Sequence, residues 1–229
     1  MAFVSVVVAL VGVLGAFLGL LPPLTGFGLY FLGMSLLPLV GVLLGLAGLW
    51  RTRRGVRDGR DRAWIGLGVS GALLLVFVLL GLPGAGVPPI HDITTSPDRP
   101  PSYHGPAAAE RDLSYPHGGG NVAEQQRLGY PDLAPIELSV AANQGYSRAL
   151  EAAREMGLEI LLEDATGLRL EATDTTRLFR FVDDFVVEVE EAGAGSVAHV
   201  RSTSRVGQSD LGANAFRIRR FAEILAPGD

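Results

Sequence analysis

Long uninterrupted apolar stretches occupy the first third of the chain. Residues 3–21, 27–50 and 64–82 contain no charged side chain. Each approaches the roughly 20 residues that a helix needs to cross a bilayer core of about 30 Å. Pro38 predicts a kink within the second stretch, because proline removes a helical hydrogen bond. We therefore predict three transmembrane helices within residues 1–86.

A short arginine-rich loop separates the second and third stretches. Its charged residues are Arg51, Arg53, Arg54, Arg57, Asp58, Arg60, Asp61 and Arg62. Loops of this kind stay in the cytoplasm, and a loop that binds anionic lipid head groups predicts the same side. We expect a cytoplasmic N-terminus in the inner membrane, and a periplasmic or other extracytoplasmic location for everything after Leu82.

The apolar stretches are rich in glycine and free of ionisable groups. The glycines include Gly41, Gly45, Gly48, Gly66 and Gly68. Small residues let transmembrane helices approach closely, which predicts packing within one bundle or, alternatively, against a partner membrane protein. Because ionisable side chains inside a membrane mark ion and proton paths, their absence disfavours an ion-coupled transporter.

A segment rich in Pro, Gly and Ala follows the third stretch and predicts a connector over residues 87–129. Few of its apolar runs are long enough for a helix or strand, so it is expected to be extended or wrapped. His91-Asp92 stands out near its start. The pair fits either acid–base chemistry or a cap or turn that docks the connector.

Residues 130–229 alternate apolar and polar positions in the manner of a folded soluble domain. Strands are predicted at 134–140, 158–163, 168–173, 179–189 and 196–205. One helix begins at an Asn143 cap and ends at Gly157, and Asp210 caps a second. The apolar face of that second helix is expected to be Leu211, Ala215, Ile218, Ala222 and Leu225.

This order predicts an α+β two-layer sandwich. About five antiparallel strands form the sheet, and two helices lie on one face so that both bury their apolar stripes. Asp183 and Asp184 are expected in a turn or bulge between strands. The predicted core is Ile160, Leu170, Phe181, Val187, Val200, Ile218 and Leu225.

Composition narrows the chemistry. The 229 residues carry a formal net charge of −5, which disfavours nucleic-acid binding, and include no cysteine, which excludes disulfides and thiolate chemistry. No P-loop, His-Glu-x-x-His or Gly-x-Ser-x-Gly motif is present. We expect neither a cofactor nor a metal ion.

Several segments resemble a bacterial family known only as domain of unknown function 1499. They are His91–Thr95, Tyr130-Pro131-Asp132, Met156-Gly157, Glu171-Ala172-Thr173, Phe181-Val182-Asp183-Asp184 and, above all, the long run from Val200 to Arg220. The resemblance covers about residues 90–226. It implies a domain that often follows membrane helices or a lipid-anchor signal, and it implies no activity.

Arginines and aspartates near the last predicted strand form the candidate site. Alternation puts His199, Arg201, Thr203 and Arg205 on one face. With a helix N-terminus nearby, an anion site is predicted from Arg201, Arg205, Asp183, Asp184, Ser209, Asp210 and Asn214. The alternative is a purely structural network in which these arginines pair with Asp183 or Asp184 and Asp210 acts as a cap.

These observations predict a membrane-anchored envelope protein without catalytic activity. Its soluble domain would bind or dock a protein partner or an anionic ligand. The expected partners are the lipid bilayer and a membrane protein. The alternative is a hydrolase or transferase that acts on lipid or cell-wall material. A deep apolar pocket with Ser, His and Asp at its mouth would favour the enzyme.

Overall fold

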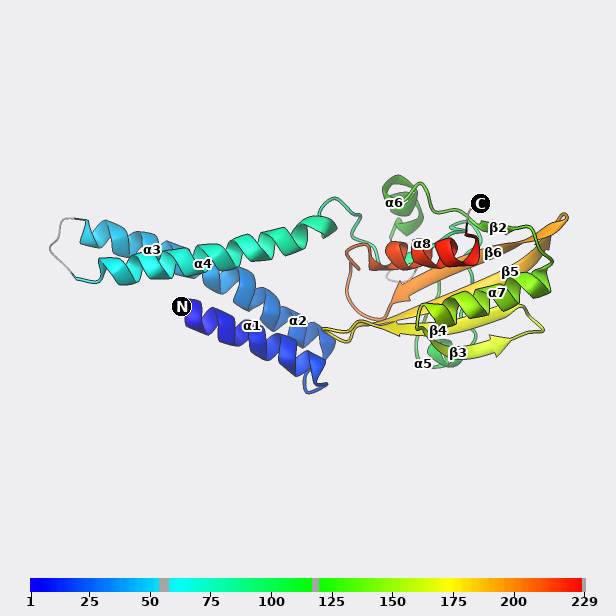
Figure 1. Cartoon of the computed structure of the whole chain (residues 1–229), viewed down its shortest axis with the longest axis horizontal. Helices are drawn as coiled ribbons and strands as arrows, with labels where there is room; N and C mark the ends of the chain where they lie inside the picture. The colour runs from blue at the N-terminus through cyan, green and yellow to red at the C-terminus, as the bar shows by residue number, and fades with distance from the viewer. Residues whose placement is uncertain (54–57, 117–119, 228–229) are drawn as a thin grey trace. The chain divides into compact units, whose positions relative to one another are not determined.

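The chain forms two compact units in a computed structural model that describes residues 1–53, 58–116 and 120–227 (Figure 1). The first unit comprises residues 1–85 and 176–180, and the second comprises 86–175 and 181–229. Arg54 and Arg57 of the predicted cytoplasmic loop lie outside the described residues.

The first unit is built from apolar helices: α1 (Ala2–Phe17), α2 (Pro23–Phe31), a π-helical turn (Leu32–Leu36), α3 (Leu37–Thr52) and α4 (Arg60–Gly81). Among the residues that the structure describes, two helices are long and apolar enough to cross a membrane: the continuous helix Pro23–Thr52 and α4. At 16 residues, α1 reaches only about 24 Å. Two of the three predicted spans therefore have sufficient length, and the count of three is not confirmed. The π-helical turn precedes Pro38, where a wider turn accommodates the proline ring.

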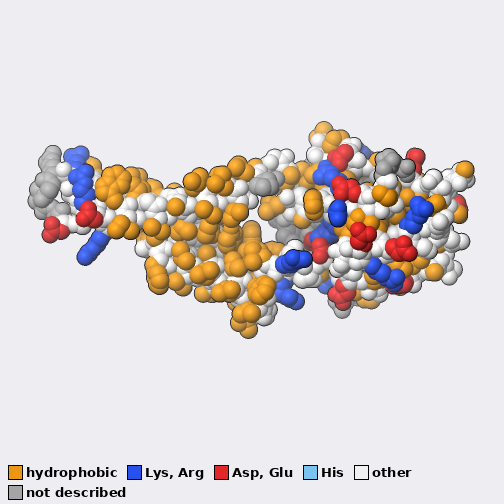
Figure 2. Space-filling view, in the orientation of Figure 1, with side chains coloured by type: hydrophobic (Ala, Val, Ile, Leu, Met, Phe, Trp, Pro, Cys, Tyr) orange, Lys and Arg blue, Asp and Glu red, His pale blue; other side chains and the backbone are white. Residues whose placement is uncertain are grey.

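Small residues bring these helices together. A Cβ atom added to Gly45 would lie 3.0 Å from the Cβ of Leu67 in α4, and one added to Gly41 would overlap Ser70. Gly66 and Gly68, by contrast, face open space. The larger apolar side chains point outward, and they cover much of the visible face of the helices in Figure 2.

The second unit contains an antiparallel sheet of six strands: β1 (Asp92–Thr94), β2 (Ile136–Leu138), β3 (Glu159–Asp164), β4 (Arg169–Thr175), β5 (Val182–Ala192) and β6 (Gly195–Ser204). The order is β1-β6-β5-β4-β3, and β2 also pairs with β6. Helix α7 (Ala142–Glu155) follows β2, and α8 (Ala213–Leu225) follows β6. The predicted α+β order is confirmed, with one additional strand at the edge.

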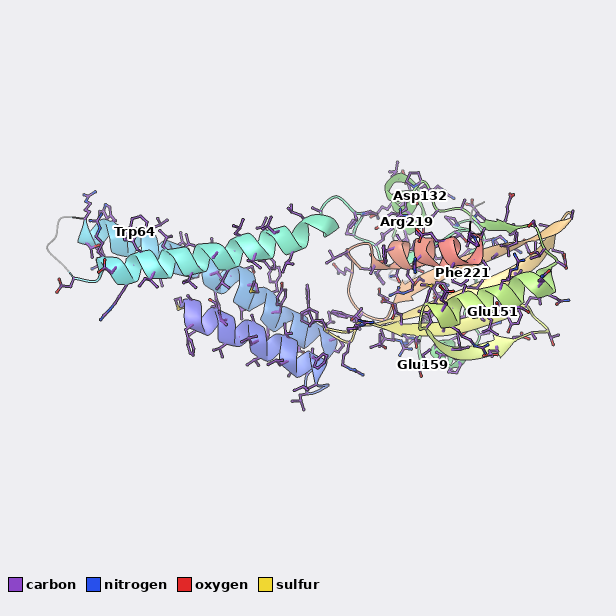
Figure 3. All side chains as sticks on the ribbon, in the orientation of Figure 1. Trp64, Asp132, Glu151, Glu159, Arg219 and Phe221 are labelled. Carbon is purple, nitrogen blue, oxygen red and sulfur yellow. The ribbon has the colours of Figure 1, made fainter. Side chains whose placement is uncertain are left out.

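Both long helices cover one face of the sheet, as predicted (Figure 1). Of the predicted core, Leu170, Val187, Val200, Ile218 and Leu225 are buried, while Ile160 and Phe181 are only partly buried. Phe221 of α8, labelled in Figure 3, packs edge-on against Phe185 with 5.1 Å between ring centroids. The alternating apolar positions of the strands thus meet the apolar stripes of α7 and α8.

Residues 87–129, which were expected to be a connector, are part of the folded second unit. They contribute β1, α5 (Pro106–Glu110) and α6 (Val122–Gly129). Tyr103, Ala107 and Leu113 pack with Val186 on the sheet face opposite α7 and α8. This packing adds a covering layer to the predicted two-layer sandwich.

Four local predictions were wrong. Asn143 does not cap α7, because the helix already begins at Ala142 and Asn143 lies within its first turn; the Ala142 N–H donates to the Glu191 carboxylate of β5. Asp183 and Asp184 lie inside the regular strand β5. Asp92 likewise lies in a strand, β1, and not in a turn. Leu211 precedes α8 and is 60% exposed, so it is not part of the buried helix face.

Candidate functional site

Strand β6 carries polar side chains on both of its faces. Because side chains alternate along a strand, Arg201 and Thr203 face the layer of residues 95–115, whereas Ser202 and Ser204 face α8. Strand β5 runs antiparallel to it, with Asp184 opposite Thr203 and Asp183 opposite Ser204. Two separate polar networks result, one on each side of the sheet.

The first network centres on a buried ion pair between Arg201 and Asp92. The Arg201 side chain is 1% exposed and that of Asp92 is fully buried. Arg201 donates through Nε (2.8 Å) and Nη2 (2.9 Å) to the two carboxylate oxygens of Asp92. It also donates to the carbonyls of Pro101 and Leu113, and the Thr203 hydroxyl donates to Asp92. This fork-to-fork geometry holds both charges in place.

Two tyrosine rings flank the Arg201 guanidinium. Its central carbon lies 5.0 Å from the centroid of the Tyr103 ring and 5.3 Å from that of Tyr115, within the range of cation–π attraction. Burial lowers the pKa of Arg201, but the hydrogen bonds and charge of Asp92 raise it more, so the net pKa is raised. Burial also raises the pKa of Tyr115, to about 12. Both side chains therefore act as hydrogen-bond donors at neutral pH.

A second carboxylate, Asp184, lies in the same network with two arginines. Its side chain is 1% exposed and accepts hydrogen bonds from Arg205 at 2.9 Å and from Arg111 at 2.5 Å. The Tyr103 hydroxyl donates to the carbonyl of Asp184. Arg111 comes from the loop after α5, so this bond also holds the covering layer on the sheet.

A cavity of about 330 Å³ lies beside this network. It is lined by Ser102, Tyr103, Ala108, Arg111, Asp112, Leu113, Ser114, Tyr115 and Arg201. Two of the lining groups are buried donors that have no hydrogen-bond partner among the residues described: Nη1 of Arg111 and the hydroxyl of Tyr115. Unsatisfied buried donors are costly, so each one in a native structure calls for an explanation. An acceptor bound in this cavity would supply it.

The second network lies on the α8 side and is centred on Arg217. This side chain is 6% exposed and donates to Asp183 at 2.7 Å and to Asp174 at 2.8 Å. It also donates to Ser202 and to Asn214, which is fully buried and bonds to Ser204 and the His91 carbonyl. Every one of these contacts is internal to the fold.

The N-cap of α8 is Gly212 and not Asp210 as predicted, but the Asp210 side chain, two residues earlier, binds the amides at the helix start. Its carboxylate accepts the N–H groups of Gly212 and Asn214, both at 2.8 Å. Burial raises the pKa of Asp210, although these two amides favour the charged form. Ser209 accepts the Leu211 N–H at 3.3 Å. The α8 N-terminus is therefore occupied by the chain's own side chains.

The predicted site residues thus do not form one cluster. Arg201 pairs with Asp92, Arg205 with Asp184, and Asp183 with Arg217 on the opposite face. The prediction placed Asp183 and Asp184 side by side in a turn or bulge. In a strand they point to opposite sides of the sheet.

Sequence reasoning missed the most informative donors, Arg111 and Tyr115. Both lie in the Pro/Gly-rich segment, where no periodicity marks them. It also missed Glu171, a buried carboxylate that accepts the N–H groups of His104 and Gly105. The His91-Asp92 pair was the one local signal, and its Asp92 is central to the network.

A hydrogen-bonded chain of a serine, a histidine and a glutamate lies on the same face of the sheet. Ser96 Oγ is 2.5 Å from His199 Nδ1, and His199 Nε2 is 3.0 Å from Glu190 Oε1. Arg99 binds Glu190 at 2.6 Å. Hydrogen bonds from Arg99 and then from His199 lower the pKa of Glu190. Within the described residues, no group of His, Asp or Glu is arranged to hold a metal ion.

The fold and site together define an α+β domain with a buried arginine–aspartate network, attached to a unit of apolar helices. Residues 92–225 match the model of a family described as Protein of unknown function (DUF1499). The match covers more than half of the chain, and the protein belongs to this family. No curated protein matches the chain.

Proposed function

We propose that this protein is a membrane-anchored module that binds an anionic group in the cavity beside Arg201, without catalytic activity of its own. The observation that carries the proposal is the pair of buried, unpartnered donors, Arg111 Nη1 and the Tyr115 hydroxyl, that line the cavity. A carboxylate or phosphate oxygen would accept from both and remove their desolvation cost.

The local charges support an anion. Arg111 and Arg205 share one carboxylate, Asp184, and Arg201 is matched one-to-one by Asp92. These five groups carry an excess of one positive charge. Asp112, which accepts the Ser114 N–H, also lines the cavity and would bring this sum to zero, but its side chain is exposed, and water screens its charge more than that of the buried groups.

Membrane anchoring is supported by the surface of the helical unit. Large apolar side chains are turned outward along its helices: Phe3 is 80% exposed, Leu44 57% and Leu80 64%. Such a surface suits lipid and not water. We propose three spans, with α1 extended by the apolar turn at residues 18–21, a cytoplasmic arginine-rich loop and an extracytoplasmic second unit. Reporter fusions after Arg53 and at the C-terminus test this; a cytoplasmic C-terminus contradicts it.

Ligand-induced stabilisation of the full chain in nanodiscs tests anion binding. Phosphate, sulfate and succinate are titrated while thermal unfolding of the second unit is followed by protease resistance. At 100 times its Kd an anion adds about 2.7 kcal/mol. We expect this gain for the wild type, a large loss in Arg111→Ala, a smaller loss in Tyr115→Phe and no change in the exposed control Arg148→Ala. Equal gains in the wild type and all three variants would refute the site.

A second candidate function is a serine hydrolase acting on an ester of envelope lipid or cell-wall material. It is favoured by the Ser96–His199–Glu190 chain, in which a proton on His199 Nε2 would donate to Glu190 and leave Nδ1 to accept from Ser96. Arg99 Nη2, which can only donate, lies 3.2 Å from the same Nε2 and opposes this tautomer. The Ser96 N–H already donates to Thr94 Oγ1, so it does not provide an oxyanion hole. Labelling by a fluorophosphonate probe that is lost in Ser96→Ala and His199→Ala would favour this reading over the first.

A further inference from the structure

Exposed apolar side chains gather at the start of α8. Among the described residues of the second unit, the large hydrophobic side chains that are exposed are Leu128, Val206, Leu211 and Phe216, and three of them fall within residues 206–216. Leu211 is 60% exposed and Phe216 is 70% exposed. We call residues 206–216 the α8 entry surface. Its one acidic residue, Asp210, is bonded to backbone amides of the helix start.

The backbone at Leu211 is unfavourable for a leucine. Its φ angle is +53°, in the left-handed region where a side chain crowds the backbone, and the next residue, Gly212, has φ +89°. Glycine at position 211 would adopt this conformation without strain. The leucine gains little packing in return, because most of its side chain is exposed. The requirements of the fold therefore do not account for this residue.

A hydrophobic staple would explain the spacing of Leu211 and Phe216 along the chain, but it would not explain why both side chains are exposed. Gly212 is the N-cap of α8, so Leu211 and Phe216 occupy the positions just before the cap and four residues into the helix. Side chains at these positions often pack against each other and fix the entry of the chain. Here each keeps more than half of its surface in solvent, which leaves an apolar face available for another contact.

The chain itself limits how far this surface lies from the end of α4. Helix α4 ends at Gly81, and Val87 already packs beside Gly212, with its Cγ1 atom 3.6 Å from the position of a Cβ on that glycine. Six residue steps of fully extended backbone reach no farther than about 22 Å. A bilayer that contains α4 is therefore within reach of the α8 entry surface.

We propose that the α8 entry surface docks on the bilayer, with Leu211 and Phe216 inserted at the boundary between head groups and acyl chains. This inference rests on the membrane anchoring proposed above. Leucine and phenylalanine are side chains that amphipathic surfaces insert at this depth. Docking would give Leu211 the apolar surroundings that the folded unit does not provide.

The absence of cysteine makes a direct test simple. Leu211→Cys and Phe216→Cys are labelled with the fluorophore NBD in the full chain, reconstituted in nanodiscs of phosphatidylcholine and phosphatidylglycerol. Glu151→Cys, on the exposed side of α7 (Figure 3), is the matched control. We expect blue-shifted emission at 211 and 216 and at least threefold stronger quenching by doxyl-labelled lipid than at 151.

Leu211→Gly separates docking from folding. Because glycine fits the observed φ angle, this variant should keep or increase protease resistance of the second unit, yet reduce lipid quenching of the label at 216 at least twofold. Quenching at 211 no stronger than at 151 overturns the inference, as does a blue shift without lipid quenching, which would indicate a protein partner. If the chain fails to float with liposomes, the proposed membrane anchoring is refuted. Flotation without quenching at 211 and 216 refutes only the docking of the α8 entry surface.

Discussion

Removing one partner of the Arg201–Asp92 pair should destabilise the second unit more than removing both. In Asp92→Asn the Arg201 charge stays 1% exposed and keeps only neutral acceptors, among them the carbonyls of Pro101 and Leu113. In Arg201→Met, Asp92 loses two charge-assisted bonds. An uncompensated buried charge costs about 3–5 kcal/mol, whereas an apolar or neutral replacement of the whole pair is often near neutral.

We therefore expect each single variant to lower the free energy of unfolding by about 3–5 kcal/mol and the double variant Asp92→Asn/Arg201→Met by less than either. Both tryptophans, Trp50 and Trp64, lie in the helical unit, so tryptophan fluorescence does not report on the second unit. Pulse proteolysis of the full chain in urea measures the free energy of unfolding of the second unit instead.

Two outcomes would refute the reasoning about the pair. Single variants within about 0.5 kcal/mol of wild type would mean that Arg201 and Asp92 are not a desolvated pair, since that range is typical of surface changes. A double variant equal to the sum of the two singles would mean that the charges are not coupled. Arg148→Met serves as the exposed control.

Three further predictions concern neighbouring contacts. Arg217→Ala leaves Asp183 buried without its guanidinium and should cost about 3 kcal/mol or more, measured by the same proteolysis; a loss below about 1 kcal/mol contradicts this. Asp210→Ala removes the acceptor for two α8 amides and should cost about 1 kcal/mol, with Asp210→Ser recovering part of it. Hydrogen bonding to the exposed Arg219 guanidinium lowers the pKa of Asp132 in the folded state (Figure 3). The pair therefore stabilises the fold fully above the unfolded pKa of about 3.9, and this stabilisation is lost as the pH falls through the lower pKa of the folded state. Arg219→Gln should abolish this acid-dependent part, at most about 1 kcal/mol, and an unchanged pH profile would contradict the assignment.

Periodicity in the sequence predicted the elements that bury a regular apolar stripe. Alternation at Leu168, Leu170 and Ala172 gave β4, and helical spacing at Ala149 and Ala153 gave α7. The conclusion that both helices share one face followed from the need to bury both stripes. These features could be predicted because each depends on residues close together along the chain.

The candidate site could be predicted only in part, because its contacts join distant segments. Two adjacent aspartates look like a turn, but Asp184 is held in a strand by Arg205 and Arg111, and Asp183 by Arg217 from α8. Nothing within a few residues of Asp183 reveals these partners. Tertiary pairing overrode the local preference.

The structure of the Pro/Gly-rich segment could not be predicted either, because its contacts also join residues that are distant along the chain. Its isolated apolar residues, such as Tyr103 and Leu113, have no period, yet they bury against Val186 and bring Arg111 to the sheet. The sequence pattern also assigned Leu211 to a buried helix face. A left-handed backbone just before the helix turned it outward instead.

The second unit cannot complete its sheet until β6 has been synthesised, because β1 pairs with β6. Asp92 meets Arg201 only after 109 further residues have been synthesised, and β1 pairs with no other strand than β6 among the described strands. At ribosomal rates of roughly 5–20 residues per second, that delay is about 5–20 s. Until then the Asp92 carboxylate remains in water, and the earliest segment of the unit stays open to proteases and chaperones. A chain that stops before β6 cannot bury this charge, so acquisition of protease resistance reports that synthesis has passed Arg201.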